Sequence, residues 1–130
     1  MKKIACIALA FAVAAGVMTH VNAEVKVEQE KGIVVGEVID LVNYAMYGRM
    51  GEDHVEECNY RAENGFPLGV LEEETGTVYV AVFRLPVPAA GLQTANAALT
   101  PYMGQKVVVQ GLKFHAPGLD MIRVSAIGEY

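Results

Sequence analysis

The sequence predicts a mainly β protein that forms one five-stranded barrel, with a helix inserted between strands 1 and 2 and a short helix between strands 3 and 4. Segments rich in Val and Ile alternate with turns marked by glycine and proline, a pattern typical of short antiparallel strands. Two pairs of these segments are separated by only a few residues, which predicts hairpins. The chain has 130 residues, enough for one compact domain.

The first strand is predicted within residues 32–46, after a polar lead over residues 24–31. Gly36 interrupts its apolar alternation, so we expect this strand to bend or bulge there. Residues 47–51 then form a turn bounded by glycine. The barrel domain is therefore expected to span residues 32–130.

A helix over residues 53–64 is predicted between the first and second strands. Asp53 is a candidate N-cap, and Asn64 followed by Gly65 is a typical helix end. One narrow apolar stripe on this helix can contact the barrel: Val55, Cys58 and Ala62.

The second and third strands are predicted as a hairpin of residues 68–71 and 77–84, with Gly76 supplying a positive φ in the acidic turn. Residues 85–91 contain two prolines and predict a loop. A short helical turn is expected over residues 94–99, before Pro101.

The last two strands are predicted over residues 106–115 and 119–127, with a tight bend at Gly111. Five strands with a helical connection between the third and fourth is the order of the OB-fold, a partly open Greek-key barrel. An open antiparallel sheet with helices on one side would give a similar order.

Residues 1–23 have the pattern of a secretory signal peptide. A charged start and an uncharged apolar run over residues 4–18 precede a small-residue cleavage site that ends at Ala23. We expect the processed chain to begin at Glu24, to work in the periplasm or outside the cell, and to have no membrane span after cleavage.

The charge balance disfavours nucleic acid as a partner. The chain has ten basic and fifteen acidic residues, and the signal removes two basic ones, which leaves a formal charge of −7. Nucleic acid and anionic lipid both require a positive surface. Cation binding is compatible with this charge.

A Tyr-Gly-Gly-His region followed by Gly-x-Pro-x-Gly-x-Leu is carried by these residues: Tyr44, Gly48, Gly51, His54, Gly65, Pro67, Gly69 and Leu71. With residues 102–111, this pattern resembles a group of small secreted bacterial proteins with an OB-fold-like barrel. The resemblance implies the fold and secretion, and it brings no established activity.

The resemblance also implies a thiolate site, because members of the group place cysteines near the positions of Asn43, Glu57 and Arg61. This chain departs from that pattern. It retains only His54 and a shifted Cys58 of the implied set.

His54 and Cys58 lie four residues apart, so a helix would place them on one face. Imidazole and sulfur suit copper or zinc, and Glu57 can add an oxygen ligand. Alternatively, Cys58 is a small buried residue and His54 an exposed one. Two other roles for Cys58 are the nucleophile of a thiol enzyme and a disulfide between two chains, which would give a homodimer.

Six acidic residues flank the second strand: Asp53, Glu56, Glu57, Glu72, Glu73 and Glu74. They would form a cation site if their two segments converged. Their spacing is not that of a calcium loop, so solvated faces are the favoured interpretation.

Four aromatic residues gather around the first connection: Tyr44, Tyr47, Tyr60 and Phe66. The OB-fold presents ligand surfaces near this position, although the rings could instead cover the barrel mouth. The leading hypothesis is a non-enzymatic, periplasmic or secreted binding module that recognises a small ligand or a protein through this connection. A copper- or zinc-handling protein is the alternative, and a thiol enzyme is the third.

Overall fold

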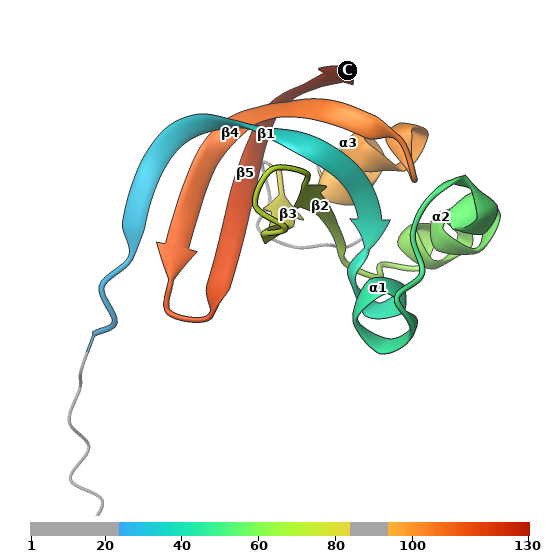
Figure 1. The fold of residues 1–130 in the computed structure, drawn as a ribbon, viewed down its shortest axis with the longest axis horizontal. Coiled ribbons are helices and arrows are strands. Elements are labelled where there is room, and N and C mark those ends of the chain that lie inside the picture. The colour runs from blue at the N-terminus through green and yellow to red at the C-terminus, as the bar shows by residue number, and fades with distance from the viewer. Residues whose placement is uncertain (1–23, 84–93) are drawn as a thin grey trace, which may run out of the picture.

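The structure is a computed structural model, and it describes residues 24–83 and 94–130. Its strands form a closed barrel in the order β1-β2-β3-β5-β4, which confirms the predicted mainly β, OB-like fold (Figure 1). The pairs are antiparallel except for β3 and β5, which run parallel. The strands have these bounds: β1 Glu28–Asp40, β2 Leu68–Glu72, β3 Val78–Val82, β4 Lys106–Ala116 and β5 Leu119–Glu129.

Helices occupy the two predicted connections. Between β1 and β2 lie α1 (Leu41–Tyr47), the 3₁₀ turn η1 (Glu52–His54) and α2 (Val55–Glu63). Between β3 and β4 lie α3 (Ala95–Leu99) and a second 3₁₀ turn, η2 (Thr100–Tyr102). The segment between β1 and β2, residues 41–67, is called the first connection below.

The prediction that the first strand runs through residues 32–46 is wrong at its end, because β1 stops at Asp40 and α1 follows. The Asp40 carboxylate accepts hydrogen bonds from the backbone N–H groups of Val42 and Asn43, at 2.9 Å each. Gly48, with φ 64°, closes the other end of α1. A side-chain cap and a left-handed glycine therefore turn an apolar, strand-like sequence into a helix.

The strand β1 begins at Glu28 rather than at Gly32, so part of the polar lead belongs to the barrel. Glu28 through Glu37 pair with β4, and Gly36 through Asp40 pair with β2. A Cβ on Gly36 would lie 2.0 Å from the Leu71 carbonyl oxygen. The register runs through Gly36 without a shift, so close backbone approach rather than a bulge requires this glycine.

The predicted bend at Gly111 is confirmed, because the β4–β5 register shifts between Gln110 and Gly111. A Cβ there would lie 2.3 Å from the Arg123 carbonyl oxygen. The predicted positive φ at Gly76 is also present, at 71°. The expected loop over residues 85–91 and the signal over residues 1–23 lie outside the described residues.

The predicted helix over residues 53–64 starts later, because Asp53 lies in η1 and the position before α2 is His54, which makes no side-chain cap. Its predicted end is confirmed, since Gly65 has φ 86° and donates to the Ala62 carbonyl. Cys58 and Ala62 face the core, as expected of the apolar stripe.

The core fills the barrel with branched aliphatic side chains, and α3 adds Leu99 to it. The buried members from the strands include Val34, Val38, Val70, Val109 and Ile122. Within residues 24–83 and 94–130, none of the helices has the length and apolar character needed to cross a membrane.

Candidate functional site

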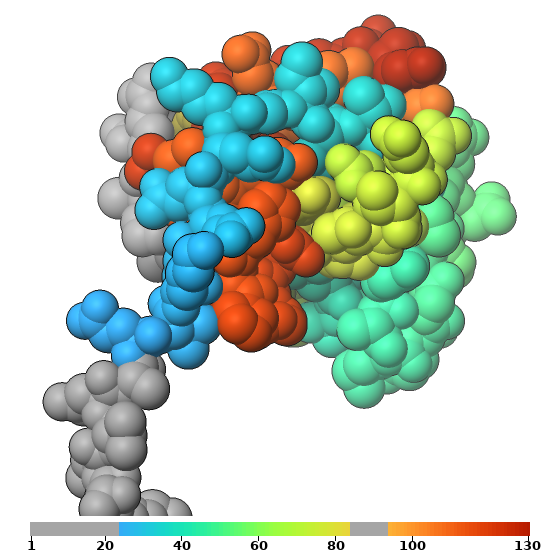
Figure 2. Space-filling view, turned by 60° about the vertical axis from the view of Figure 1, so that its left-hand side comes forward, coloured from blue at the N-terminus to red at the C-terminus, as the bar shows by residue number. Residues whose placement is uncertain are grey.

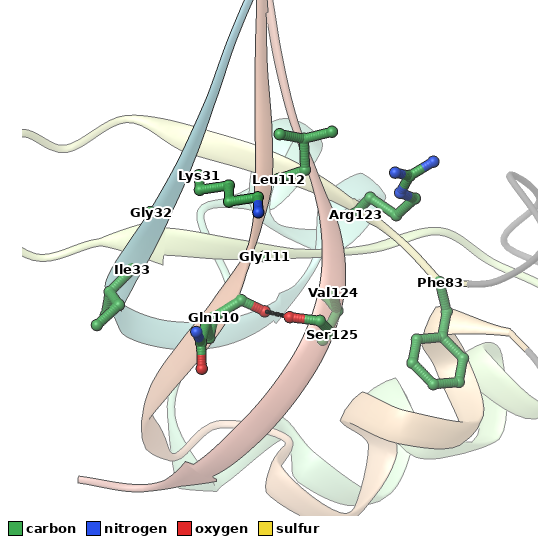
Figure 3. Close-up of a pocket in the computed structure, with 10 residues that line it drawn as sticks. All are labelled: Lys31, Gly32, Ile33, Phe83, Gln110, Gly111, Leu112, Arg123, Val124 and Ser125. Atoms are coloured by element: carbon green, nitrogen blue, oxygen red, sulfur yellow. Dashed lines mark hydrogen bonds between the residues drawn. The ribbon is translucent and has the colours of Figure 1, made fainter.

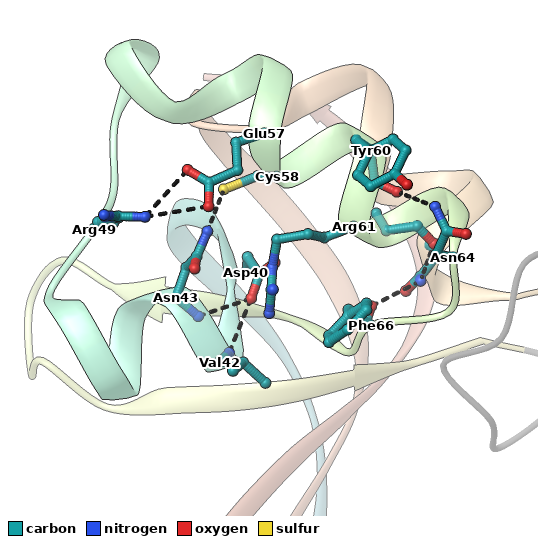
Figure 4. Close-up of polar contacts among 12 residues, drawn as sticks. Asp40, Val42, Asn43, Arg49, Glu57, Cys58, Tyr60, Arg61, Asn64 and Phe66 are labelled. Atoms are coloured by element: carbon teal, nitrogen blue, oxygen red, sulfur yellow. Dashed lines mark hydrogen bonds and ion pairs between the residues drawn. The ribbon is translucent and has the colours of Figure 1, made fainter.

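Asp40 anchors the first connection at the end of β1. Its side chain is fully buried, one oxygen caps α1, and the other accepts a 2.6 Å hydrogen bond from Nε of Arg61 on α2 (Figure 4). This bond raises the pKa of Arg61 above its ordinary value, so the guanidinium stays charged. The carboxylate therefore ties both helices of the connection to the barrel.

Two further contacts fix the end of α2. The Arg61 guanidinium lies 4.0 Å from the centre of the Phe66 ring, a cation–π geometry. Asn96 on α3 donates to the Ala62 and Phe66 carbonyl oxygens at 2.8 and 2.9 Å. The first connection is thus held in place from β1 and from α3.

Cys58 is buried on α2, and its sulfur accepts a weak 3.7 Å contact from the Asn43 side-chain amide. Burial raises the pKa of this thiol, and the negative charges of Asp40 and Glu57 add to that shift. Nucleophilic attack and soft-metal ligation both require the thiolate. The environment of Cys58 therefore favours the interpretation of a small core residue.

The predicted metal ligands His54, Cys58 and Glu57 do not form a metal-binding cluster in the structure. Glu57 is exposed and forms an ion pair with Arg49 at 3.2 Å (Figure 4). His54 ends η1 and is only partly buried. Within the described ranges, no three His, Cys, Asp or Glu side chains lie close enough together to hold an ion.

The four predicted aromatic residues differ in exposure and in the groups that they contact. Tyr47 and Tyr60 are 59% and 69% exposed, on α1 and α2 respectively. Arg49 stacks over the Tyr47 ring at 4.8 Å, whereas the Phe66 ring lies beneath the Arg61 guanidinium. Tyr44, also on α1, is the one that lines the cavity described next.

A cavity of about 420 Å³ lies where the first connection meets the β2–β3 hairpin. In Figure 2 the hairpin, in yellow-green, lies beside the teal segment that contains α1. This first-connection cavity is lined by Gly36, Glu37, Tyr44, Met50, Leu71, Glu72, Glu73, Gly76 and Lys106.

The first-connection cavity combines apolar groups with an excess of negative charge. Tyr44 and Met50 supply a ring and a thioether, while three carboxylates face one ammonium. Glu37 accepts the backbone N–H of Gly51 at 2.5 Å, and Glu73 forms an ion pair with Lys106. The third carboxylate belongs to Glu72. Three carboxylates and one ammonium give the lining side chains a formal charge of −2.

Some residues that line this cavity already stood out in the sequence. Tyr44 was a predicted ligand residue, and Glu72 and Glu73 belong to the acidic runs that were interpreted as solvated faces. Glu37, Met50 and Lys106 were missed, because they approach one another only when β1, the first connection and β4 come together in the barrel.

No protein-family model, curated protein or solved structure matches the chain.

Proposed function

We propose that this chain is a non-enzymatic OB-like binding module that works in the periplasm or outside the cell and takes a small cationic ligand in the first-connection cavity. The observation that carries the proposal is the composition of that cavity: an aromatic ring and a thioether beside three carboxylates and a single ammonium.

The size and charge of the cavity support a small ligand. Pockets for small molecules usually measure about 300–1,000 Å³ and combine apolar walls with a few polar groups. An ammonium group is attracted by the net negative lining and by the face of a tyrosine ring. An aromatic or alkyl body would contact Tyr44, Met50 and Leu71.

The ion pair between Lys106 and Glu73 can open to let Glu73 pair with a ligand instead. Their ion pair lies at the cavity wall, and both side chains are partly exposed, at 39% and 64%. A ligand ammonium can replace the lysine as the partner of Glu73, at a small cost because exposed ion pairs are weak.

The proposal is tested by calorimetric titration with benzyltrimethylammonium, using benzyl alcohol and benzoate as neutral and anionic comparators. We expect only the cation to bind. Glu73→Gln should weaken its affinity about fivefold, because it removes a carboxylate and leaves Lys106 unpaired.

Two matched controls come from neighbouring residues. Glu74→Gln removes the same charge one residue away, and Tyr47→Leu removes a ring from α1 that does not line the cavity. Both should leave the affinity unchanged, whereas Tyr44→Leu should reduce it. Equal effects of Glu73→Gln and Glu74→Gln, or benzoate binding as tightly as the cation, would contradict the proposal.

A further inference from the structure

A second cavity, of about 840 Å³, lies across β1, β4 and β5 at the end of β3 (Figure 3). Its walls include Lys31, Ile33, Phe83, Leu112 and Arg123. It shares no lining residue with the first-connection cavity. This three-strand cavity is therefore a separate feature of the barrel.

Two glycines line this cavity, next to the register shift in β4. Gly32 and Gly111 both line it and lie directly opposite each other in the β1–β4 ladder. A Cβ on Gly111 would collide with backbone, and one on Gly32 would lie 2.9 Å from the Lys113 side chain. Their Cβ positions point toward the Lys113 and Ile122 side chains, which do not line the cavity, so the two glycines contribute only backbone to its wall.

The two basic residues of this cavity stand apart from the other basic residues that the structure describes. Each of the other five described lysines and arginines forms an ion pair with a carboxylate: Lys26, Arg49, Arg61, Lys106 and Lys113. Among residues 24–83 and 94–130, Lys31 and Arg123 are the two lysine or arginine side chains without a carboxylate within ion-pair distance. Both line the three-strand cavity.

Two neighbouring cations without a carboxylate partner are unexpected in an acidic chain. Fifteen Asp and Glu residues compete for ten Lys and Arg residues, so most cations find a carboxylate. No Asp or Glu is among the described residues that line the three-strand cavity. It is thus a cationic recess on a protein that is negative overall.

The strand register sets the geometry of the two cations. Lys31 lies opposite Leu112, and Leu112 lies opposite Arg123, so the three form one cross-strand row on the same face. Two strand spacings place the outer Cα atoms about 10 Å apart. Figure 3 shows the Lys31 side chain directed toward β4 and the Arg123 side chain directed away from it. Rotation of the Arg123 side chain to another rotamer would bring both cations within reach of one anionic group above Leu112.

We propose that the three-strand cavity binds a small organic anion, whose carboxylate or phosphate group lies between Lys31 and Arg123 and whose apolar body contacts Leu112 and Ile33. Ile33 is 57% exposed, so it offers apolar surface that the fold itself leaves uncovered. The site is independent of the proposed cation site.

A single-stranded nucleic acid is the competing occupant, and the charges disfavour it. Such strands are held by a continuous basic groove with several stacking rings. Here two cations flank one leucine, in a processed chain expected to carry a net charge of −7.

The test is calorimetric titration of the processed protein with decanoate, decyl phosphate, decanol, inorganic phosphate and a thymidine oligonucleotide. We expect decanoate or decyl phosphate to bind, and which of them binds more tightly identifies the head group. Lys31→Gln/Arg123→Gln should weaken that binding about tenfold, the effect of two partly exposed ion pairs.

The matched control is Lys26→Gln/Arg49→Gln, which removes the same charge from two exposed cations outside the cavity. It should retain the affinity, and neither double variant should alter the binding of benzyltrimethylammonium. Equal weakening by both double variants, or no binding of either decyl anion, would overturn the proposal. Binding of decanol or inorganic phosphate as tightly as the decyl anions, or preferential binding of the oligonucleotide, would also overturn it.

Discussion

At the scale of single residues, Asp40 combines full burial of its side chain with two structural roles. It is a fully buried carboxylate that both caps α1 and holds Arg61, so it joins the end of a strand to two helices. A buried charge without its partner is strongly destabilising, whereas an exposed pair contributes little. The two arginines of the first connection allow this difference to be measured.

Arg61→Ala should lower the free energy of unfolding by about 3 kcal/mol, because it leaves the buried Asp40 carboxylate without its cation. Arg49→Ala should cost less than about 1 kcal/mol, because its partner Glu57 remains in water. Both variants also lose an arginine–aromatic contact, so they are matched. Urea denaturation measures the two values, and equal losses would contradict the anchoring role of Asp40.

At the scale of elements, the barrel depends on the strands β1 and β4, whose long ladders join its two halves. The β4–β5 hairpin bends at Gly111, where the register shifts. Its far end carries a charged group in which His115 lies between Asp120 and Glu30, at 2.6 and 3.4 Å. These features give two predictions about the hairpin.

Gly111→Ala should destabilise the protein by about 1–3 kcal/mol, because a Cβ there meets the Arg123 carbonyl and the backbone must move. Gly128→Ala is the control. Gly128 lies in the partner strand β5, and no atom lies within 4 Å of its Cβ position. That change should be neutral or slightly stabilising. Thermal unfolding compares them, and similar melting temperatures would mean that the bend does not require glycine.

The stability contributed by His115 should decrease as the pH rises. The hydrogen bond with Asp120 raises the pKa of His115, burial opposes this shift, and Glu30 adds to it. Lys113 disfavours the charged ring, and the Tyr79 ring packs edge-on at 6.0 Å. Because the folded pKa exceeds the unfolded value of about 6.5, the contribution is complete below that pH and is lost as the pH rises through the folded pKa.

The measurement is the difference in unfolding free energy between the wild type and His115→Gln, followed from about pH 5.5 to about pH 8.5. This difference should shrink as the pH rises. In an Asp120→Asn background most of the pH dependence should disappear. A difference that grows with pH would show that the assigned interactions do not stabilise the imidazolium.

At the scale of the whole molecule, the sequence allowed the barrel to be predicted because its signals are local. Gly76 and Gly111 occupy the turn and the bend that their positions indicated. The helix α1 was missed because the apolar residues after Asp40 continue a strand-like pattern. The cap on Asp40 has meaning only once the end of β1 is known.

The candidate site was less predictable than the barrel, because its residues come together only in the folded chain, whereas the signals for the barrel are local. The first-connection cavity joins Glu37 and Tyr44 to Glu73 and Lys106, which are distant in the chain and meet the first pair only through barrel closure. Each of the four has an ordinary local role as a strand, helix or turn residue. Aromatic composition pointed to the first connection, but the convergence of charged residues could be seen only from the strand register.

Binding of a small cation in the first-connection cavity can be followed through the backbone amide resonances during titration with benzyltrimethylammonium. We expect saturable shifts at Gly36, Tyr44, Gly76 and Lys106, with Asp120 at the opposite hairpin unchanged. Shifts concentrated in the three-strand cavity around Gly32 and Gly111, or none that saturate, would contradict it.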